Sequence, residues 1–212
     1  MSGFRDRILS TLAGQLGNPH GILGKGVAGF LNRGNRRAIE GAVEAAAVTP
    51  GATVADIGFG GGAGLALLLA GVGAAGAVHG IEPSADMLAR AESRFARDLD
   101  AGRLLLSAGS LTGLPLADDS LDAAITVNTF YFVPDLAAAC AELARVVRSG
   151  GRAVVGIGDP DAMAKMPFTA YGFTLRPVPE VIAALEQAGC AVEHRPLENR
   201  PIPHHLLIAR PG

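Results

Sequence analysis

Beyond residue 50 the sequence alternates short apolar runs with longer segments of helical pattern, and this alternation narrows the choice of fold most. The runs that predict strands cover residues 53–57, 77–82, 103–108, 121–127, 152–157, 191–197 and 205–209. The segments that predict helices begin at Gly62, run from Ser84 to about Leu99, and cover 136–147 and 178–188. Strands that alternate with helices are joined by right-handed crossovers into a largely parallel sheet with both faces covered. The sequence therefore predicts a Rossmann-like, doubly wound α/β domain.

The composition excludes several classes of protein. Of the 212 residues, 49% are hydrophobic and 18% are charged, which excludes intrinsic disorder. The formal net charge of −2 argues against a broad basic surface for nucleic acid. Cys140 and Cys190 match no metal-ligand spacing and cannot form a disulfide framework. We therefore expect no metal site and a reducing, cytoplasmic location.

One uncharged stretch, residues 57–78, is long enough to suggest a membrane-spanning helix. It is rich in glycine and has no arginine or lysine at its ends, so a glycine-rich turn followed by a buried helix fits better. At the N-terminus, Arg5 and Arg7 precede only a short apolar run. We therefore expect neither a membrane span nor a signal peptide.

The first predicted strand runs directly into a glycine-rich loop. The loop covers residues 56–64 and includes Gly58, Gly60 and Gly62. Glycine lets the backbone turn tightly and approach a ligand closely. Glu82 ends the second strand, 22 residues after Gly60, where a carboxylate can accept hydrogen bonds from ribose hydroxyls. This order of elements predicts a nucleoside-binding site at the carboxyl ends of the strands.

Two nucleoside cofactors compete for this loop. The spacing Gly58-x-Gly60-x-x-Ala63 satisfies the dinucleotide fingerprint, which favours NAD. Asp56 lies two residues before the first glycine, where its negative charge would oppose a nearby pyrophosphate. A cationic ligand with a free amine, such as S-adenosylmethionine, would be attracted to the same carboxylate. Purely structural roles, at a strand end for Asp56 and at a helix N-terminus for Glu82, are the alternatives.

The later segments resemble a known family. Residues 114–122, LPLADDSLD, are followed by AAITVNTFYFVPD and then by AELARVVRSGGRAVV. Together with VADIGFGGG and HGIEPSADMLARAESRF, they resemble, in the right order over residues 53–158, the ubiquinone/menaquinone-biosynthesis type (type 11) of class I S-adenosylmethionine-dependent methyltransferase. The resemblance implies a seven-stranded, mostly parallel sheet with an antiparallel last strand. It also implies S-adenosyl-L-methionine as the cofactor.

Carried over to this sequence, the resemblance implies a set of cofactor-binding residues. Gly58, Gly60 and Gly62 would line the methionine and ribose part of the cofactor, with Asp56 near its amino group. Glu82 would hold the ribose hydroxyls.

The resemblance implies further contacts at the adenine and at the methyl group. Met87 would approach the adenine, and Asn128, just beyond the fourth strand, would border the transferred methyl unless it is only a polar strand-end cap. Ser110 and Leu111 stand where the family usually shows Asp-Ala. The Ser110 hydroxyl can accept one hydrogen bond from the adenine amine, but without the added strength of a charged acceptor.

Methyl transfer is an in-line displacement at an already activated sulfonium, so positioning and exclusion of water supply much of the rate. A base is needed only if the acceptor loses a proton as it attacks. The sequence identifies no obvious base, and the catalytic residues stay undetermined. The two candidates are Tyr131, which the family places at the wall of the transfer cavity, and His20, in the N-terminal segment. His204 and His205 lie at a strand start in a predicted hairpin and are weaker candidates.

Several other features receive structural interpretations. Asp122 opens the fourth strand, at the wrong end for a cofactor. The pair at 150–151, two glycines, predicts a helix-ending turn, and Arg145 and Arg148 would complement the dipole at that helix C-terminus. The segment 159–176 mixes methionine and aromatic residues, which suits either an apolar pocket wall or core packing under a long loop.

We therefore expect one methyltransferase domain over residues 1–212. It would comprise an N-terminal helical cap or lid over 1–40, a cofactor-binding core over 50–158, and a substrate-side loop with the C-terminal helix and strands over 159–212. The expected partner is a small, partly apolar methyl acceptor, with the oligomeric state left open. Two alternatives remain: a non-catalytic cofactor- or partner-binding module of the same fold, and a nicotinamide-dependent oxidoreductase.

Overall fold

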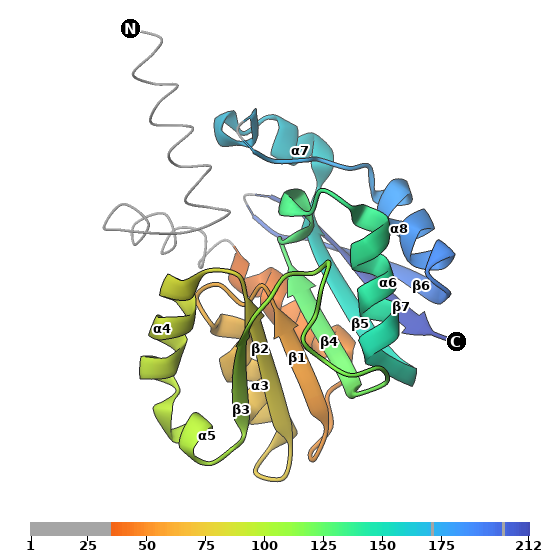
Figure 1. Ribbon diagram of the computed structural model, residues 1–212. Helices are drawn as coiled ribbons and strands as arrows, with labels where there is room; N and C mark the ends of the chain where they lie inside the picture. The colour runs from red at the N-terminus through yellow and green to blue at the C-terminus, as the bar shows by residue number, and fades with distance from the viewer. Residues whose placement is uncertain (1–34, 171, 201) are drawn as a thin grey trace, which may run out of the picture.

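The computed structural model describes residues 35–170, 172–200 and 202–212 (Figure 1). At its centre lies a seven-stranded sheet with the strand order β3-β2-β1-β4-β5-β7-β6. The strands are β1 (Thr53–Ile57), β2 (Ala77–Glu82), β3 (Leu104–Ala108), β4 (Leu121–Val127), β5 (Val147–Gly158), β6 (Cys190–Leu197) and β7 (His204–Pro211). β1 to β5 pair in parallel, whereas β7 is antiparallel to both β5 and β6. The predicted fold class, including the antiparallel last strand, is confirmed.

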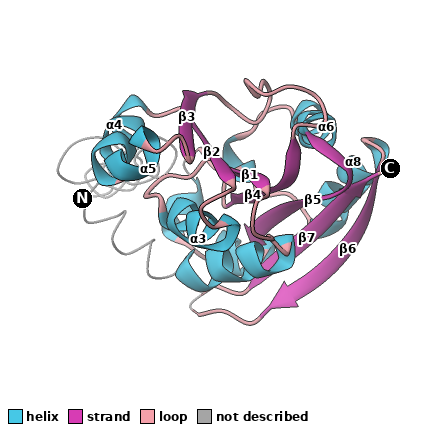
Figure 2. Ribbon diagram, turned by 90° about the horizontal axis from the view of Figure 1, so that it is seen from below, coloured by secondary structure: helices cyan, strands magenta, loops and turns pink. Residues whose placement is uncertain are grey.

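Helices cover both faces of the sheet (Figure 2). They are α3 (Ala63–Val72), α4 (Ala85–Arg94), α5 (Ala96–Asp100), α6 (Leu136–Val146), α7 (Pro160–Ala164) and α8 (Val178–Gln187), with short 3-10 turns η1 (Phe130–Phe132) and η2 (Pro167–Ala170). Buried side chains of α3, α4 and a helix over 35–46 pack on one face, and those of α6 and α8 pack on the other. Most of the predicted N-terminal cap, including His20, lies outside the described residues.

The uncharged stretch 57–78 forms a glycine-rich loop and the buried helix α3, as predicted. Leu65, Leu68, Leu69 and Val72 recur at helical spacing and are buried against the sheet. Among the described residues, no helix is long and apolar enough to cross a bilayer.

The helix predicted from Ser84 to about Leu99 is interrupted at Phe95, where the backbone leaves the helical conformation between α4 and α5. Ser84 is the N-cap residue as predicted, although its side chain makes no capping hydrogen bond. The interruption turns Phe95 inward, where it is only 7% exposed. A Cβ atom placed on Gly62 would lie 3.0 Å from the Phe95 ring. The break therefore packs an aromatic ring against the glycine loop.

The interpretation of the glycine pair at 150–151 as a helix-ending turn is wrong. α6 ends at Val146, and both glycines lie within β5, where the pairing with β4 shifts register between Leu121 and Ala123. Gly150 has φ +79°, and a Cβ on Gly151 would lie 2.8 Å from the Asp122 carbonyl oxygen. The irregular strand therefore needs these glycines for its bulge.

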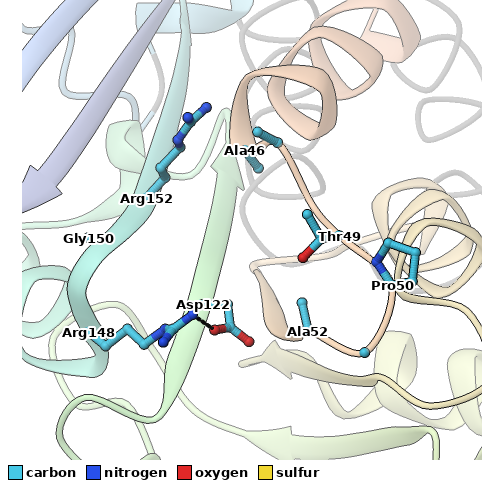
Figure 3. A pocket seen from close by; sticks show the side chains of 10 residues that line it. Ala46, Thr49, Pro50, Ala52, Asp122, Arg148, Gly150 and Arg152 are labelled. Atoms are coloured by element: carbon cyan, nitrogen blue, oxygen red, sulfur yellow. Dashed lines mark ion pairs between the residues drawn. The ribbon is translucent and has the colours of Figure 1, made fainter.

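The two arginines of this region differ: Arg145 lies in the last turn of α6, as predicted, whereas Arg148 lies outside the helix. Arg148 belongs to β5 and forms an ion pair with Asp122 (Figure 3). Asp122 also accepts a hydrogen bond from the Thr53 backbone N–H at 2.6 Å, which confirms its structural role. Asp122 and Arg148 line a pocket of about 410 Å³ at the amino-terminal edge of β1 and β4, away from the edge where the glycine loop lies.

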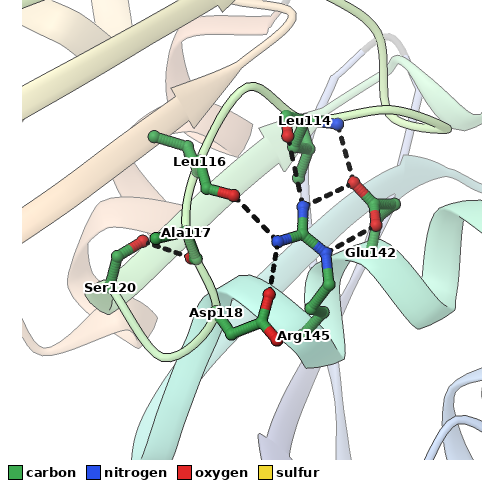
Figure 4. A network of polar contacts seen from close by, with 7 residues as sticks. All are labelled: Leu114, Leu116, Ala117, Asp118, Ser120, Glu142 and Arg145. Carbon is green, nitrogen blue, oxygen red and sulfur yellow. Dashed lines mark hydrogen bonds and ion pairs between the residues drawn. The ribbon is translucent and has the colours of Figure 1, made fainter.

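Arg145 joins α6 to the crossover from β3 to β4 (Figure 4). Its guanidinium donates to the carbonyl oxygens of Leu116 at 2.8 Å and Leu114 at 3.2 Å, and to the carboxylates of Asp118 and Glu142, each at 2.7 Å. Glu142 also accepts the Leu114 backbone N–H at 2.7 Å. One guanidinium thus ties down a helix-free crossover, which is the connection that carries Ser110.

Candidate functional site

The carboxyl ends of the parallel strands bring together residues that are far apart in the sequence. Asp56 lies near the end of β1 and leads into the glycine loop, and Glu82 ends β2. Ser110 follows β3, and Asn128 follows β4. In open α/β sheets, ligands bind in the crevice outside these ends, at the point where strand order reverses. In this sheet that point lies between β1 and β4, next to the glycine loop.

The loop conformation explains why glycines occupy it. Gly58, Gly60 and Gly62 have φ values of +73°, +49° and +73°, in the left-handed region that other residues avoid. A Cβ on Gly58 would collide with the Thr129 side chain, in the turn that follows β4. The glycine loop and the turn after β4 are therefore in van der Waals contact.

Glu82 holds the loop in this conformation. Its two carboxylate oxygens accept the backbone N–H groups of Gly60 at 3.0 Å and Ser84 at 3.1 Å. Only 4% of the residue is exposed, and this burial raises the pKa of the carboxyl group despite the two hydrogen bonds. A carboxylate in this position both shapes the loop and keeps acceptor capacity for a ligand.

Asp56 is a second buried acid at the same edge. Burial and the negative charge of Glu82 raise its pKa to about 7, although the Leu65 backbone N–H donates to it. A Cβ on Gly64 would collide with its carboxylate, so the acid lies directly against the start of α3. Neither acid forms an ion pair within the described part of the chain. The pair favours a cationic ligand and opposes a pyrophosphate.

The structure gives the predicted adenine-side residues different surroundings. Met87 is 2% exposed and packs in the core on the α3 face, and Leu111 is 5% exposed in the core on the α6 face. Ser110 is exposed, and its hydroxyl lies 3.2 Å from the Thr112 hydroxyl. Their contacts with adenine therefore stay predictions.

Tyr131 is buried beside Asn128. Its hydroxyl donates to Asn128 Oδ1 at 3.1 Å and accepts the Gly158 backbone N–H. Burial raises the pKa of this phenol well above its usual value. A phenol that donates its proton to a hydrogen bond with Asn128 and whose pKa is raised is poorly suited to act as a base. Its ring instead packs with those of Phe132 and Phe173, at centroid distances of 6.2 and 5.6 Å.

Sequence reasoning gave too little weight to His204. This residue opens β7, is 4% exposed, and places Nε2 3.3 Å from the Asn128 side-chain nitrogen. One signal could have found it, because His204, Leu206 and Ile208 alternate along β7 and share a buried face. The partner, 76 residues away in the sequence, could not be identified in this way.

Comparisons with known proteins agree with this geometry. The family described as a methyltransferase domain matches residues 55–155. Arsenite methyltransferase of Halobacterium salinarum is 32% identical over 164 residues, which are 73% of this chain and 41% of the relative. Demethylmenaquinone methyltransferase of Desulfitobacterium hafniense is 36% identical over 125 residues, which are 58% and 48% of the two chains. This chain thus spans less than half the length of these curated relatives.

A solved geranyl diphosphate methyltransferase in complex with S-adenosylmethionine has the same fold. It superposes with a TM-score of 0.73 at 16% identity and covers 94% of each chain. The strand order, the glycine loop with its two acids, and the matched domain lead to one assignment. Over residues 55–155 the chain is a methyltransferase domain, and its fold is that of class I S-adenosylmethionine-dependent methyltransferases.

Proposed function

We propose that this protein transfers a methyl group from S-adenosylmethionine to a small, partly apolar molecule. The observation that carries the proposal is the pair of buried acids, Asp56 and Glu82, beside a loop built from left-handed glycines. Two carboxylates that form no ion pair with any described residue attract a ligand that carries both a sulfonium and an ammonium group.

The cofactor would lie across the carboxyl ends of β1, β2 and β4. Asp56 would face its amino group and Glu82 its ribose hydroxyls, while Asn128 would border the transferred methyl. The glycine loop, with Gly58, Gly60 and Gly62, would line the methionine and ribose part. Met87, Ser110 and Leu111 would border the adenine.

The surroundings of Tyr131 support an apolar acceptor. Three aromatic rings, those of Tyr131, Phe132 and Phe173, pack together beyond the end of β4, and Met163 of α7 is buried in the same cluster. Two of the similar proteins act on small molecules by name, arsenite and geranyl diphosphate. The segment 159–212 would form the acceptor side of the site, and residues 1–40, with His20, would cover it. We expect no nucleic-acid substrate.

The reaction would need little from the protein beyond positioning. The acceptor atom attacks the methyl carbon in line with the sulfur, the carbon–sulfur bond breaks, and its electron pair returns to sulfur as S-adenosylhomocysteine forms. Holding the acceptor close and dry supplies much of the acceleration. Because the Tyr131 proton is engaged by Asn128, we do not assign Tyr131 as a base.

Calorimetric titration tests the proposal with S-adenosylmethionine, S-adenosylhomocysteine and NADH. We expect both sulfur nucleosides to bind and NADH not to bind. Binding of NADH alone would replace the proposal with the oxidoreductase alternative. Failure of all three ligands to bind the folded protein would favour a non-catalytic module.

The substitution Glu82→Gln tests the assigned ribose contact. It removes the charged acceptor, so we expect cofactor binding to weaken by about 1–3 kcal/mol. Glu92→Gln, at an exposed position of α4, is the matched control and should leave binding unchanged. Equal affinity of Glu82→Gln and the control, with both variants folded, would refute the contact.

A further inference from the structure

A buried histidine of the last strand contacts the turn after β4. His204 pairs with Gly158 of β5 and with Leu197 of β6, so its backbone lies within the C-terminal part of the sheet. Its imidazole Nε2 lies 3.3 Å from the side-chain nitrogen of Asn128. The contact joins the hairpin formed by β6 and β7 to the turn after β4, next to the point between β1 and β4 where strand order reverses.

The hydrogen-bond partners determine the tautomer of His204. Nδ1 lies 2.9 Å from the Ile202 carbonyl oxygen, and a carbonyl can only accept, so Nδ1 carries the proton. The Asn199 amide nitrogen, which is also a donor, lies 3.2 Å from the same Nδ1. An unprotonated Nδ1 would accept from Asn199 but would leave the Ile202 carbonyl and the Asn128 amide nitrogen unmatched, so the Nδ1–H tautomer satisfies more partners. Nε2 is then unprotonated and accepts from the Asn128 amide. Burial lowers the pKa of the imidazole, which keeps the ring neutral.

This tautomer decides the orientation of the Asn128 amide. Its nitrogen points to His204, and its oxygen accepts the Tyr131 hydroxyl, which in turn accepts the Gly158 backbone N–H. The hydrogen bonds therefore run in a defined order across the ends of β4, β5 and β7.

The same contact supports a backbone conformation that most residues avoid. Asn128 has φ +59°, in the left-handed region. Its N–H donates to the Gly156 carbonyl at 2.8 Å, and the next residue, Thr129, packs against Gly58 of the glycine loop. A change in the backbone conformation of the turn at Asn128 would therefore move Thr129 and alter its contact with the glycine loop.

We propose that His204 is a positioning residue for methyl transfer, which holds the Asn128 amide in the one orientation that keeps the turn after β4 against the glycine loop. This inference rests on the proposed function, since it places Asn128 beside the transferred methyl. It predicts that the geometry at the methyl group depends on an acceptor nitrogen supplied by the last strand.

Protonation of His204 would break its hydrogen bond with Asn128, because both Nε2 and the Asn128 amide nitrogen would then be donors. Tyr131 of η1 bonds to the oxygen of the same Asn128 amide. On the side of the β6–β7 hairpin the titratable neighbour is His205, which contacts Asp159 at 3.1 Å and His194 at 2.9 Å. His205 lowers the pKa of His204 further. The arrangement should therefore fail only at acid pH.

Two substitutions separate the two ring nitrogens. Gln at position 204 places an amide oxygen near the former Nε2 and can accept from Asn128. Asn places its amide nitrogen near the former Nδ1, so it can donate to Ile202 but cannot reach Asn128. We expect His204→Asn to weaken binding of S-adenosylmethionine about tenfold, as for one lost hydrogen bond, and to weaken S-adenosylhomocysteine less, because the homocysteine product lacks the methyl group.

We expect His204→Gln to bind S-adenosylmethionine with an affinity within about threefold of that of the parent protein. The part of the decrease in affinity at acid pH that comes from protonation of His204 should be absent in this variant. Asp56 is present in both proteins, so the difference between them isolates His204. His194→Gln, at an exposed position of the same hairpin, is the control and should match the parent. Thermal unfolding shows whether each variant is folded.

The outcomes separate this inference from the proposed function. If the parent protein binds neither sulfur nucleoside, the proposed function fails first. If the parent binds but folded His204→Asn retains its affinity and its preference between the two nucleosides, His204 is only structural. Nitrogen NMR of the histidine rings gives a second readout without ligand, because a proton found on Nε2 of His204 would overturn the inference.

Discussion

At the scale of single residues, the site depends on two buried acids, Asp56 and Glu82, which lie at the ends of adjacent strands. Burial raises the pKa of both carboxyl groups, and the negative charge of Glu82 raises the pKa of Asp56 further. Because their pKa values are raised, a bound positive charge would change their protonation. A buried carboxyl with a raised pKa is often a functional group, because such an environment costs free energy.

The pKa of Asp56, raised to about 7, predicts a pH-dependent affinity. Below that pH the free protein holds a proton on Asp56, and a cationic cofactor favours the carboxylate, so binding must release the proton. Affinity for S-adenosylmethionine should therefore rise from about pH 5.5 to 7 and then level off. Titrations in buffers of different ionisation enthalpy would measure the released proton.

Asp56→Asn is the matching variant. It removes both the charge and the titration, so affinity near pH 7 should fall and the part of the slope due to Asp56 should disappear. Any slope that the variant retains belongs to other groups such as His204. If the variant and the parent have identical pH profiles, Asp56 is not the group that responds to the cofactor.

At the scale of elements, the break between α4 and α5 serves the glycine loop. The Phe95 ring packs on Gly62, and the Arg94 guanidinium lies 5.0 Å from the centre of that ring. Arg94 also donates to the Gly61 carbonyl oxygen at 2.9 Å. A helix that continued through Phe95 would direct this ring away from the glycine loop. The interruption therefore allows the ring to pack on the loop.

Arg94→Gln should weaken cofactor binding with little effect on folding. Arg94 is exposed, so its contribution to stability is small, but its loss frees one loop carbonyl. We expect a decrease in affinity of about 0.5–1.5 kcal/mol, which titration calorimetry can measure. Arg90→Gln, on the same helix and also exposed, is the control, and an equal effect in both variants would argue for a general loss of positive charge.

At the scale of the whole molecule, the crossover from β3 to β4 differs from the other described crossovers between parallel strands because it contains no helix, and Arg145 compensates. The crossover from β3 to β4 is held against α6 by hydrogen bonds that Arg145 and Glu142 share. These bonds lower the pKa of Glu142 and raise that of Arg145, so both groups stay charged. The crossover carries Leu114 into the core, where it is 5% exposed.

Arg145→Gln should lower the free energy of unfolding by about 2 kcal/mol, because charged hydrogen bonds to partly buried groups are lost. Urea unfolding measures this change. Arg148→Gln breaks an ion pair whose arginine side chain is 59% exposed and should cost about 1 kcal/mol or less. The reverse order of the two effects would contradict the role assigned to the Arg145 network.

The sequence by itself determined the fold class and the two acids beside the glycine loop. It also placed six of the seven strands to within about two residues, whereas β5 begins at Val147, earlier than the predicted residue 152. These features follow from local periodicity and from the rule that ligands bind at the carboxyl ends of parallel strands. The resemblance to the methyltransferase family added the antiparallel last strand, which β7 confirms.

Only the tertiary structure decided the break at Phe95, the placement of the glycine pair at 150–151 within β5, and the partners of Arg145. The tertiary structure also determined the hydrogen-bond partners of the Tyr131 hydroxyl, Asn128 and Gly158, and the contact between His204 and Asn128. The physical reason is the same in each case: the partner lies far away in the sequence or across the sheet, and no local pattern encodes which buried polar groups will meet. Burial then requires each of these groups to find a hydrogen-bond partner, and packing determines which one.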